Sequence, residues 1–333
     1  MKYRYLSTIG VAVCALMLSS ATGSALAQEW SLPRTAEGQV DLNGVWDFRT
    51  ITPLERPSEL ADQEFLTDEE AAEFEYQSGQ ARNADLNRER VVTDRQIVNG
   101  TTETADLRLA YNEFWWDRGT KVVGTRRTSL VIDPPNGHVP ALAPDGERRQ
   151  AARQARNQRV AAGPEDRPLA ERCILGFNSG PPMLPGGYNQ NVHLLQTPDH
   201  IVLVNEMVHN ARIIPMDGRP HGNLKQWTGD SRGRWEGDTL VVETKHFRGG
   251  TSFRDSSENL HLVERFTRVS GDTMVYEFTV EDPTTWTRPW TAEVPMTKTD
   301  IPMFEYACHE GNYGIVGTLS GARAVDRNAA DSR

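Results

Sequence analysis

Alternation of apolar and polar residues is the dominant pattern of the second half of the chain, and it predicts β-strands. Residues 192–197, 201–208 and 211–215 form three such runs, separated by short polar turns. Two later segments repeat each other, because residues 236–243 are EGDTLVVE and residues 270–277 are SGDTMVYE. Each Gly-Asp pair is a turn between two strands. The succession therefore predicts an antiparallel meander.

The number and spacing of the predicted strands indicate one large β domain. About ten short strands, with very little helix after Arg172, are typical of an up-and-down barrel or a β sandwich. The first strand, residues 41–48, contains Gly44-Val45-Trp46, which resembles the glycine-x-tryptophan opening of lipocalin-type barrels. Together with the meander, this resemblance leads us to expect a mainly β, lipocalin-like barrel that encloses a ligand cavity.

Two polar segments interrupt the β pattern near residues 58–87 and 145–172. The first contains Thr67-Asp68-Glu69-Glu70, a capping box that predicts the start of a helix. The second alternates arginines with glutamine and alanine and has few apolar residues, which predicts a solvated helix or loop; an interaction arm is the alternative.

The first 27 residues have the features of a secretory signal peptide. Lys2 and Arg4 precede an apolar run at residues 9–18, and residues 25–27 are Ala-Leu-Ala. The run is too short to span a bilayer, and no later run is longer or more apolar. We therefore expect a single domain, residues 28–333, that is exported to the periplasm or secreted without a membrane span.

Charge and cysteine content narrow the class of protein further. The net charge of −10 argues against a nucleic-acid partner, which clustered positive charge would attract. Without the signal peptide the chain keeps two cysteines, Cys173 and Cys308. An oxidising compartment favours a disulfide between them, and two unpaired buried thiols are the alternative.

Four longer motifs carry a resemblance to a family. They are FWWDRG at residues 114–119, GDSRGRWEGDTLVV at 229–242, SENLHLVERF at 257–266 and YACHEGNY at 306–313. With these motifs the chain resembles a family of uncharacterised exported proteins from soil and marine bacteria. The resemblance implies export and brings no catalytic assignment.

Two glutamates are the first candidates for chemistry. Glu264 alternates with Leu260, Leu262 and Phe266, and Glu206 alternates with valines 202, 204 and 208, so both are predicted on apolar faces. A buried carboxylate needs a partner or stays protonated, and either glutamate could act as a base. Alternatively, both form ordinary ion pairs with arginines; the nearest in sequence are Arg212, Arg234 and Arg265.

Histidines and tryptophans complete the predicted site. His209, His261 or His309 would be the acid–base partner of a glutamate. If a strand continues through residues 306–310, Cys308 and His309 point to opposite faces and form no dyad. Trp116, Trp235 and Trp290 would stack on a ring-shaped ligand, or else plug the barrel ends. No HExxH or Cys-x-x-Cys motif occurs, so we assign no metal and no organic cofactor; a divalent ion is a minority alternative.

These observations lead to one functional hypothesis and two alternatives. The first is an exported hydrolase, lyase or isomerase that uses Glu/His acid–base chemistry on a small cyclic or aromatic substrate in the barrel cavity. The second is a periplasmic binding or carrier protein for a small ligand, without catalysis. The third is a structural envelope protein whose acids serve only as ion pairs of the sheet.

Overall fold

A computed structural model describes residues 30–86, 96–98, 101–103, 112–249 and 253–331. The predicted signal peptide, residues 1–27, lies outside the described residues. Residues Leu32–Arg333 form one unit of the chain. The fold described below is that of this unit.

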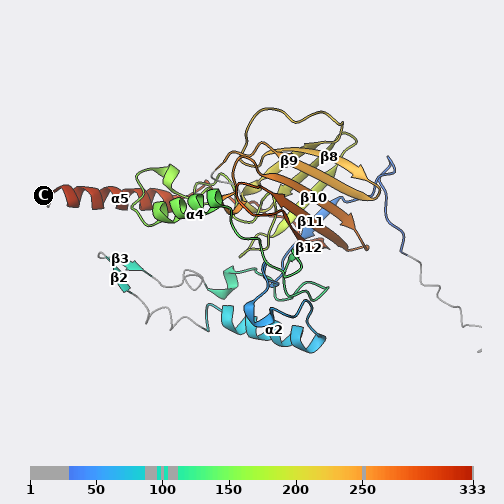
Figure 1. The fold of residues 1–333 in the computed structure, drawn as a ribbon, viewed down its shortest axis with the longest axis horizontal. Helices are drawn as coiled ribbons and strands as arrows, with labels where there is room; N and C mark the ends of the chain where they lie inside the picture. Colours follow the sequence, from blue (N-terminus) through green and yellow to red (C-terminus); the bar gives the residue numbers. More distant parts are fainter. Residues whose placement is uncertain (1–29, 87–95, 99–100, 104–111, 250–252, 332–333) are drawn as a thin grey trace, which may run out of the picture. The chain divides into compact units, whose positions relative to one another are not determined.

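Ten strands form one antiparallel sheet, and Figure 1 shows part of it, β8 to β12, side by side. Its order is β7-β6-β5-β1-β12-β11-β10-β9-β8, and β4 also pairs with β12. The strands are β1 (Gly44–Asp47), β4 (Val131–Asp133), β5 (Asn191–Gln196), β6 (His200–Asn205), β7 (Ala211–Pro215), β8 (Asp230–Glu236), β9 (Thr239–Lys245), β10 (His261–Arg268), β11 (Thr273–Glu281) and β12 (Trp290–Thr299). A separate hairpin joins β2 (Gln96–Val98) and β3 (Thr101–Glu103).

The predicted meander is confirmed. The repeated Gly-Asp segments form the hairpins β8–β9 and β10–β11, and each strand from β8 to β12 pairs with the next one along the chain. Gly237 turns the first hairpin with a φ of 59°, a conformation that glycine adopts without strain. The mainly β, antiparallel class predicted from alternation is therefore correct.

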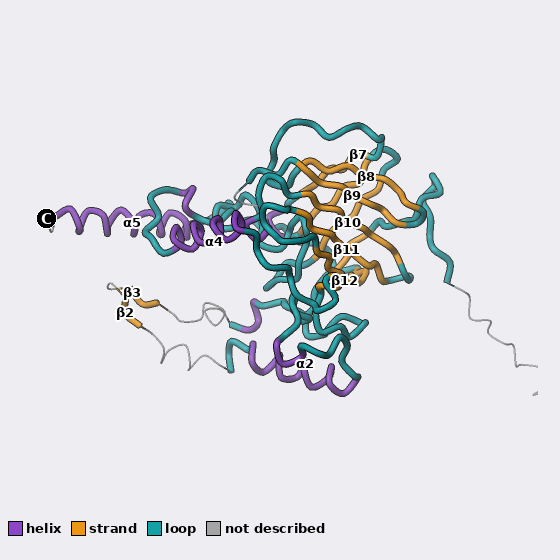
Figure 2. The backbone as a smooth tube through the Cα atoms, in the orientation of Figure 1, coloured by secondary structure: helices purple, strands orange, loops and turns teal. Residues whose placement is uncertain are grey.

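The sheet is not closed into a barrel, so the closed form of the prediction is not confirmed. The edge strands β7 and β8 lie side by side in Figure 2, and a Cβ at Gly233 of β8 would lie 3.1 Å from Cγ2 of Ile214 in β7. The described strands nevertheless show no β7–β8 pairing. The chain leaves β7 through a long irregular loop, residues 216–229, instead of a tight turn that would set a register.

Large side chains fill the inner face of the curled sheet. Trp46, Phe266, Phe278 and Trp290 are all fully buried in one apolar cluster with residues from most strands. Phe278 packs on Trp290 at a centroid distance of 5.9 Å, and Phe266 packs on Tyr276 at 4.9 Å. The interior is therefore a packed core, and the enclosed ligand cavity that we expected within it is replaced by aromatic side chains.

Three α-helices lie outside the sheet: α2 (Asp68–Arg82), α4 (Pro144–Asn157) and α5 (Tyr313–Asp331). The first two fall in the predicted polar segments, and the capping box between Thr67 and Glu70 is formed. The short 3-10 helices are η1 (Ser58–Leu60), η3 (Glu113–Trp115), η4 (Pro164–Asp166), η5 (Met207–His209) and η6 (Phe253–Asp255). None of the helices in the described chain is long and apolar enough to cross a membrane.

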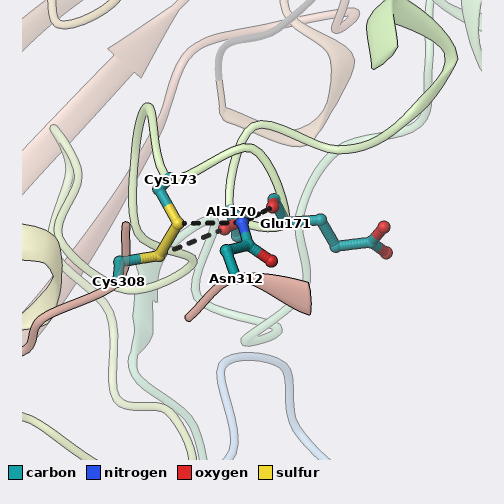
Figure 3. The surroundings of a disulfide bond; sticks show 5 residues. All are labelled: Ala170, Glu171, Cys173, Cys308 and Asn312. Atoms are coloured by element: carbon teal, nitrogen blue, oxygen red, sulfur yellow. Dashed lines mark hydrogen bonds between the residues drawn. A yellow bond between two sulfur atoms is a disulfide. The ribbon is translucent and has the colours of Figure 1, made fainter. Parts of the chain in front are cut away.

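The segment after β12 does not continue as a strand, which was the condition for alternation there. Residues 306–310 have no strand structure, so alternation does not apply to Cys308 and His309, and the next residues start α5. Cys308 is bonded to Cys173 with an S–S distance of 2.04 Å (Figure 3), which confirms the predicted disulfide. Asn312 reinforces this junction, because its Nδ2 donates to the carbonyl of Glu171 at 2.8 Å.

Candidate functional site

Glu264 lies on the inner face of the sheet, as alternation predicts, and it is fully buried. Its carboxylate accepts two hydrogen bonds from Arg212, at 2.6 and 2.8 Å, and one from the hydroxyl of Tyr276 at 2.8 Å. Burial lowers the pKa of Arg212, but the Glu264 carboxylate raises it by more, so the guanidinium group stays charged. Burial and the same carboxylate hold the pKa of Tyr276 well above its ordinary value. Glu264 is thus one member of a buried ion pair with Arg212, and Nε of Arg212 is left without a hydrogen-bond partner in the described structure.

Glu206 is also buried, but for a reason that alternation did not capture. Strand β6 ends at Asn205, and Glu206 already has helical φ and ψ of −60° and −40°. Its carboxylate accepts from Nδ2 of Asn191 at 2.8 Å and from the backbone N–H of the same residue at 3.3 Å. The partner is an amide instead of an arginine. No hydrogen bond or ion pair joins Glu206 to Glu264 in the described structure.

The candidate histidines are dispersed over the molecule. His209 is exposed and has a φ of 49° at the end of η5. His309 is exposed in the turn that precedes α5. His261 lies on the outer face of β10, whereas Glu264 lies on the inner face. The structure therefore does not bring the five predicted catalytic residues together.

The three candidate tryptophans occupy different environments. Trp290 is fully buried against Phe253 and Trp286, so it belongs to the core and not to a rim. Trp235 is half-buried and packs against the core. Trp116 lies under the guanidinium group of Arg118, which is 3.9 Å from the ring centroid. No ring contact joins any two of the three in the described structure.

His261 belongs to a cluster on the outer face that the sequence did not reveal. Its Nε2 lies 2.8 Å from Oε1 of Glu243, and its Nδ1 lies 3.3 Å from Oε2 of Glu281. Glu243 also accepts from Lys245 at 2.6 Å, and this hydrogen bond is the main reason that the pKa of Glu243 is lowered. The imidazole thus bridges the carboxylates of β9 and β11.

The long loop between β7 and β8 brings a second histidine to the same face. Nδ1 of His221 lies 3.3 Å from Oδ2 of Asp230, and its ring centroid lies 6.0 Å from that of His246. The same Asp230 oxygen accepts the backbone N–H of Gly222 at 2.7 Å. Among the described residues, no group of three His, Cys, Asp or Glu side chains is arranged to hold a metal ion.

A pocket of about 510 Å³ opens beside one end of the core, and we call it the arginine pocket. Its lining comes from α4, from the loop between residues 165 and 184, from Trp227 and from η6. Five arginines and three carboxylates line it: Arg153, Arg156, Arg167, Arg172, Arg254, Glu165, Asp166 and Asp255. Phe177, Trp227 and Phe253 supply aromatic surface. Sequence reasoning proposed none of the charged residues as site residues.

The base of the arginine pocket is continuous with the core. Phe253 packs on Phe278 and Trp290 at centroid distances of 6.4 and 5.7 Å. Met183, which follows the lining residue Pro182, donates its backbone N–H to the hydroxyl of Tyr276 at 3.1 Å. The pocket is therefore linked to the Arg212–Glu264 ion pair through Tyr276, whose hydroxyl donates to Glu264.

Two anchors hold the walls of the arginine pocket. The disulfide fixes the residue after Arg172 to the segment beyond β12. On the other side, Nε of Arg153 lies 2.9 Å from the carboxylate of Asp255, which links α4 to η6. Burial raises the pKa of Asp255, although the guanidinium groups of Arg153, Arg156 and Arg149 oppose this effect.

Three of the eight described non-glycine residues with positive φ lie at these anchors. Cys173, Arg254 and Asp255 have φ angles of 54°, 50° and 63°. A non-glycine residue in this region costs about 1–3 kcal/mol, and such residues gather at sites where the surrounding structure holds them for a purpose. The arginine pocket is thus the part of the molecule where a cavity, aromatic surface, surplus positive charge and strain coincide.

The arrangement can bind a small molecule through stacking and charge, but histidine is absent from the pocket lining. Acid–base groups occur instead on the outer face, around His261. In comparisons with known proteins, no family model, no curated protein and no solved structure matches this chain.

Proposed function

We propose that this chain is an exported binding or carrier protein that holds a small ring-bearing molecule in the arginine pocket. The observation that carries the proposal is the pocket itself: about 510 Å³ with three aromatic side chains from separate segments. Pockets for small ligands span roughly 300–1,000 Å³ and combine apolar surface with a few polar groups. Phe177, 53% exposed, is available to a ring that enters from solvent.

The predicted lipocalin-like arrangement would place the ligand differently from the arginine pocket. In a barrel of that kind the ligand would occupy the interior, but here Trp46, Tyr276 and Phe278 fill the inner face. We therefore place the proposed ligand at the end of the curled sheet, where Phe253 joins the pocket to the core. The resemblance to lipocalins thus remains a prediction about the arrangement of the strands. The proposed binding site does not depend on it.

Export is part of the proposal and has two supports. The first is the predicted signal peptide, and the second is the disulfide, since such bonds persist in oxidising compartments. Cell fractionation with N-terminal sequencing of the product tests it: we expect a periplasmic or secreted chain that begins near Gln28. An intact N-terminus in the cytoplasm would contradict it.

Binding can be tested with a panel of cyclic and aromatic compounds, followed by thermal shift and tryptophan fluorescence. For compounds that bind, Trp227→Leu and Phe177→Ala should each weaken affinity about tenfold, because each ring contributes stacking and apolar contact. Trp115→Leu is the matched control, because Trp115 is 65% exposed and does not line the pocket. Equal affinities for all three variants and the wild type would exclude this pocket.

A second candidate function is acid–base catalysis at the outer face. The supporting observation is that His261 lies between Glu243 and Glu281, so its imidazole can exchange a proton with either carboxylate. A hydrolase, lyase or isomerase acting there would lose at least about a hundredfold in kcat with His261→Gln. Glu236→Gln, on the same face but away from His261, should leave the turnover unchanged.

A further inference from the structure

The charged lining of the arginine pocket is unbalanced. Five arginines face three carboxylates, in a protein whose net charge is −10. A surplus of positive charge in such an acidic chain does not follow from composition. Two of these arginines are neutralised by carboxylates outside the lining, so the informative ones are the arginines that remain unpaired in the described part of the chain.

Not all five arginines are engaged in ion pairs. Arg153 pairs with Asp255, Arg167 with Glu171 and Arg254 with Glu55. Asp166 is paired with an arginine outside the lining, Arg159, at 2.9 Å. These ion pairs therefore involve three of the five arginines that line the pocket and leave two of them unpaired among the described residues.

Arg156 and Arg172 are the two that stay without a side-chain hydrogen bond or ion pair within the described chain. Arg156 comes from α4 and Arg172 from the loop that the disulfide holds, so they belong to different walls. A guanidinium group presents a planar fork of donors that matches a carboxylate with two parallel hydrogen bonds. Both arginines line the same cavity as the aromatic side chains.

We propose that the ligand of the arginine pocket is an organic acid, a ring-bearing carboxylate whose charged group is bound by Arg156 and Arg172. This inference rests on the proposed binding function and specifies its ligand class. The ring lies on the aromatic surface of Phe177 and Trp227, while the carboxylate replaces water on the two guanidinium groups. Asp255 limits the affinity, because its own carboxylate lies in the same pocket and pairs with Arg153.

Three naphthalene probes separate the contributions of ring and charge: 2-naphthoate, the neutral 2-naphthamide and 2-naphthyl phosphate. In calorimetric titrations of the mature, disulfide-bonded protein, the carboxylate should bind at least about tenfold more tightly than the amide. Its affinity should fall as NaCl is raised, whereas that of the amide should not. Tighter binding of the phosphate than of the carboxylate would overturn the assignment to organic acids.

Variants locate the charged contact. Arg156→Gln and Arg172→Gln should each weaken 2-naphthoate binding about five- to tenfold and leave 2-naphthamide unchanged. Arg148→Gln is the matched control, since Arg148 is on the same helix, pairs with Asp145 and does not line the pocket. Asp255→Asn should tighten 2-naphthoate binding about two- to fivefold, and asparagine tolerates the positive φ of this position.

The outcomes distinguish this inference from the binding function itself. If acid and amide bind equally, and both lose affinity with Phe177→Ala, the pocket binds rings and the carboxylate inference is wrong. If no naphthalene probe binds, or if Phe177→Ala has no effect on any of them, both the binding function and the inference are wrong. Thermal midpoints of all variants show whether a loss reflects unfolding instead of binding.

Discussion

Removing the charge of Glu264 tests whether the buried ion pair stabilises the fold. In Glu264→Gln, the amide keeps one acceptor oxygen, but its NH₂ group must face a donor of Arg212 or of Tyr276. The Arg212 guanidinium, whose side chain is 3% exposed, then has no opposite charge. Breaking a buried pair in this way costs about 3–5 kcal/mol. We therefore expect the free energy of unfolding to fall by that amount.

Equilibrium urea unfolding, followed by tryptophan fluorescence with the disulfide intact, measures this loss. Glu236→Gln is the control, because Glu236 pairs with Arg234 and Arg265 at the surface and its substitution should leave the midpoint unchanged. The double variant Arg212→Met/Glu264→Leu should lose only about 1–3 kcal/mol, mainly because the Tyr276 hydroxyl loses its acceptor. Equal midpoints for Glu264→Gln and Glu236→Gln would refute the reasoning.

Three further predictions concern the disulfide, the core and acid stability. Cys308→Ser should lower the free energy of unfolding by about 2–4 kcal/mol in urea, because the bond closes a loop with a sequence separation of 135. Trp290→Ala should cost about 3–5 kcal/mol in the same assay, since its fully buried ring leaves a cavity, whereas Trp115→Ala should cost almost nothing. Burial raises the pKa of Asp282, but hydrogen bonds, the strongest from Thr285, lower it on balance. Asp282 therefore stabilises the fold above about pH 4, and this contribution is lost as the pH falls further; Asp282→Asn should flatten the acid side of a stability profile.

Long strands could be predicted because alternate residues are buried, so apolar and polar residues alternate in their sequence. In β10, Leu262, Glu264 and Phe266 all point inward, as alternation requires over eight residues. The same logic failed for Glu206, because the chain turns directly after Asn205 through η5, where Val208 has a φ of 61°. No glycine or proline marks that turn, so nothing in the local sequence signals it.

Helix α5 was missed for a different reason. Its first half contains Gly314, Gly317 and Gly321, which are poor helix formers and resemble a loop. Ala322 is its one buried residue, so no apolar stripe marks a helix in the sequence. The disulfide, in contrast, could be predicted from the number of cysteines and the export signal alone.

The arginine pocket could not be predicted, since its residues have no common period and come from irregular segments. Part of the signal was present: Arg149, Arg153 and Arg156 are four and three residues apart, which places them on one face of a helix. Arg149 anchors that face by donating to the carbonyls of Asp255 and Thr284. The fold and the disulfide determine which segments meet at the pocket. The local sequence pattern does not encode this information.

The position of β1 in the sheet has a consequence for how the chain assembles. β5 to β7 and β8 to β12 are two runs of sequential hairpins. Among the described strands, only β1 is hydrogen-bonded to both runs, through three residue pairs with β12 and four with β5. Each run can form from local contacts, whereas β1 pairs with residues about 250 positions away in the sequence. We expect this four-residue strand to dock last and to set the folding rate, so weakening it would leave two half-sheets that fold without joining.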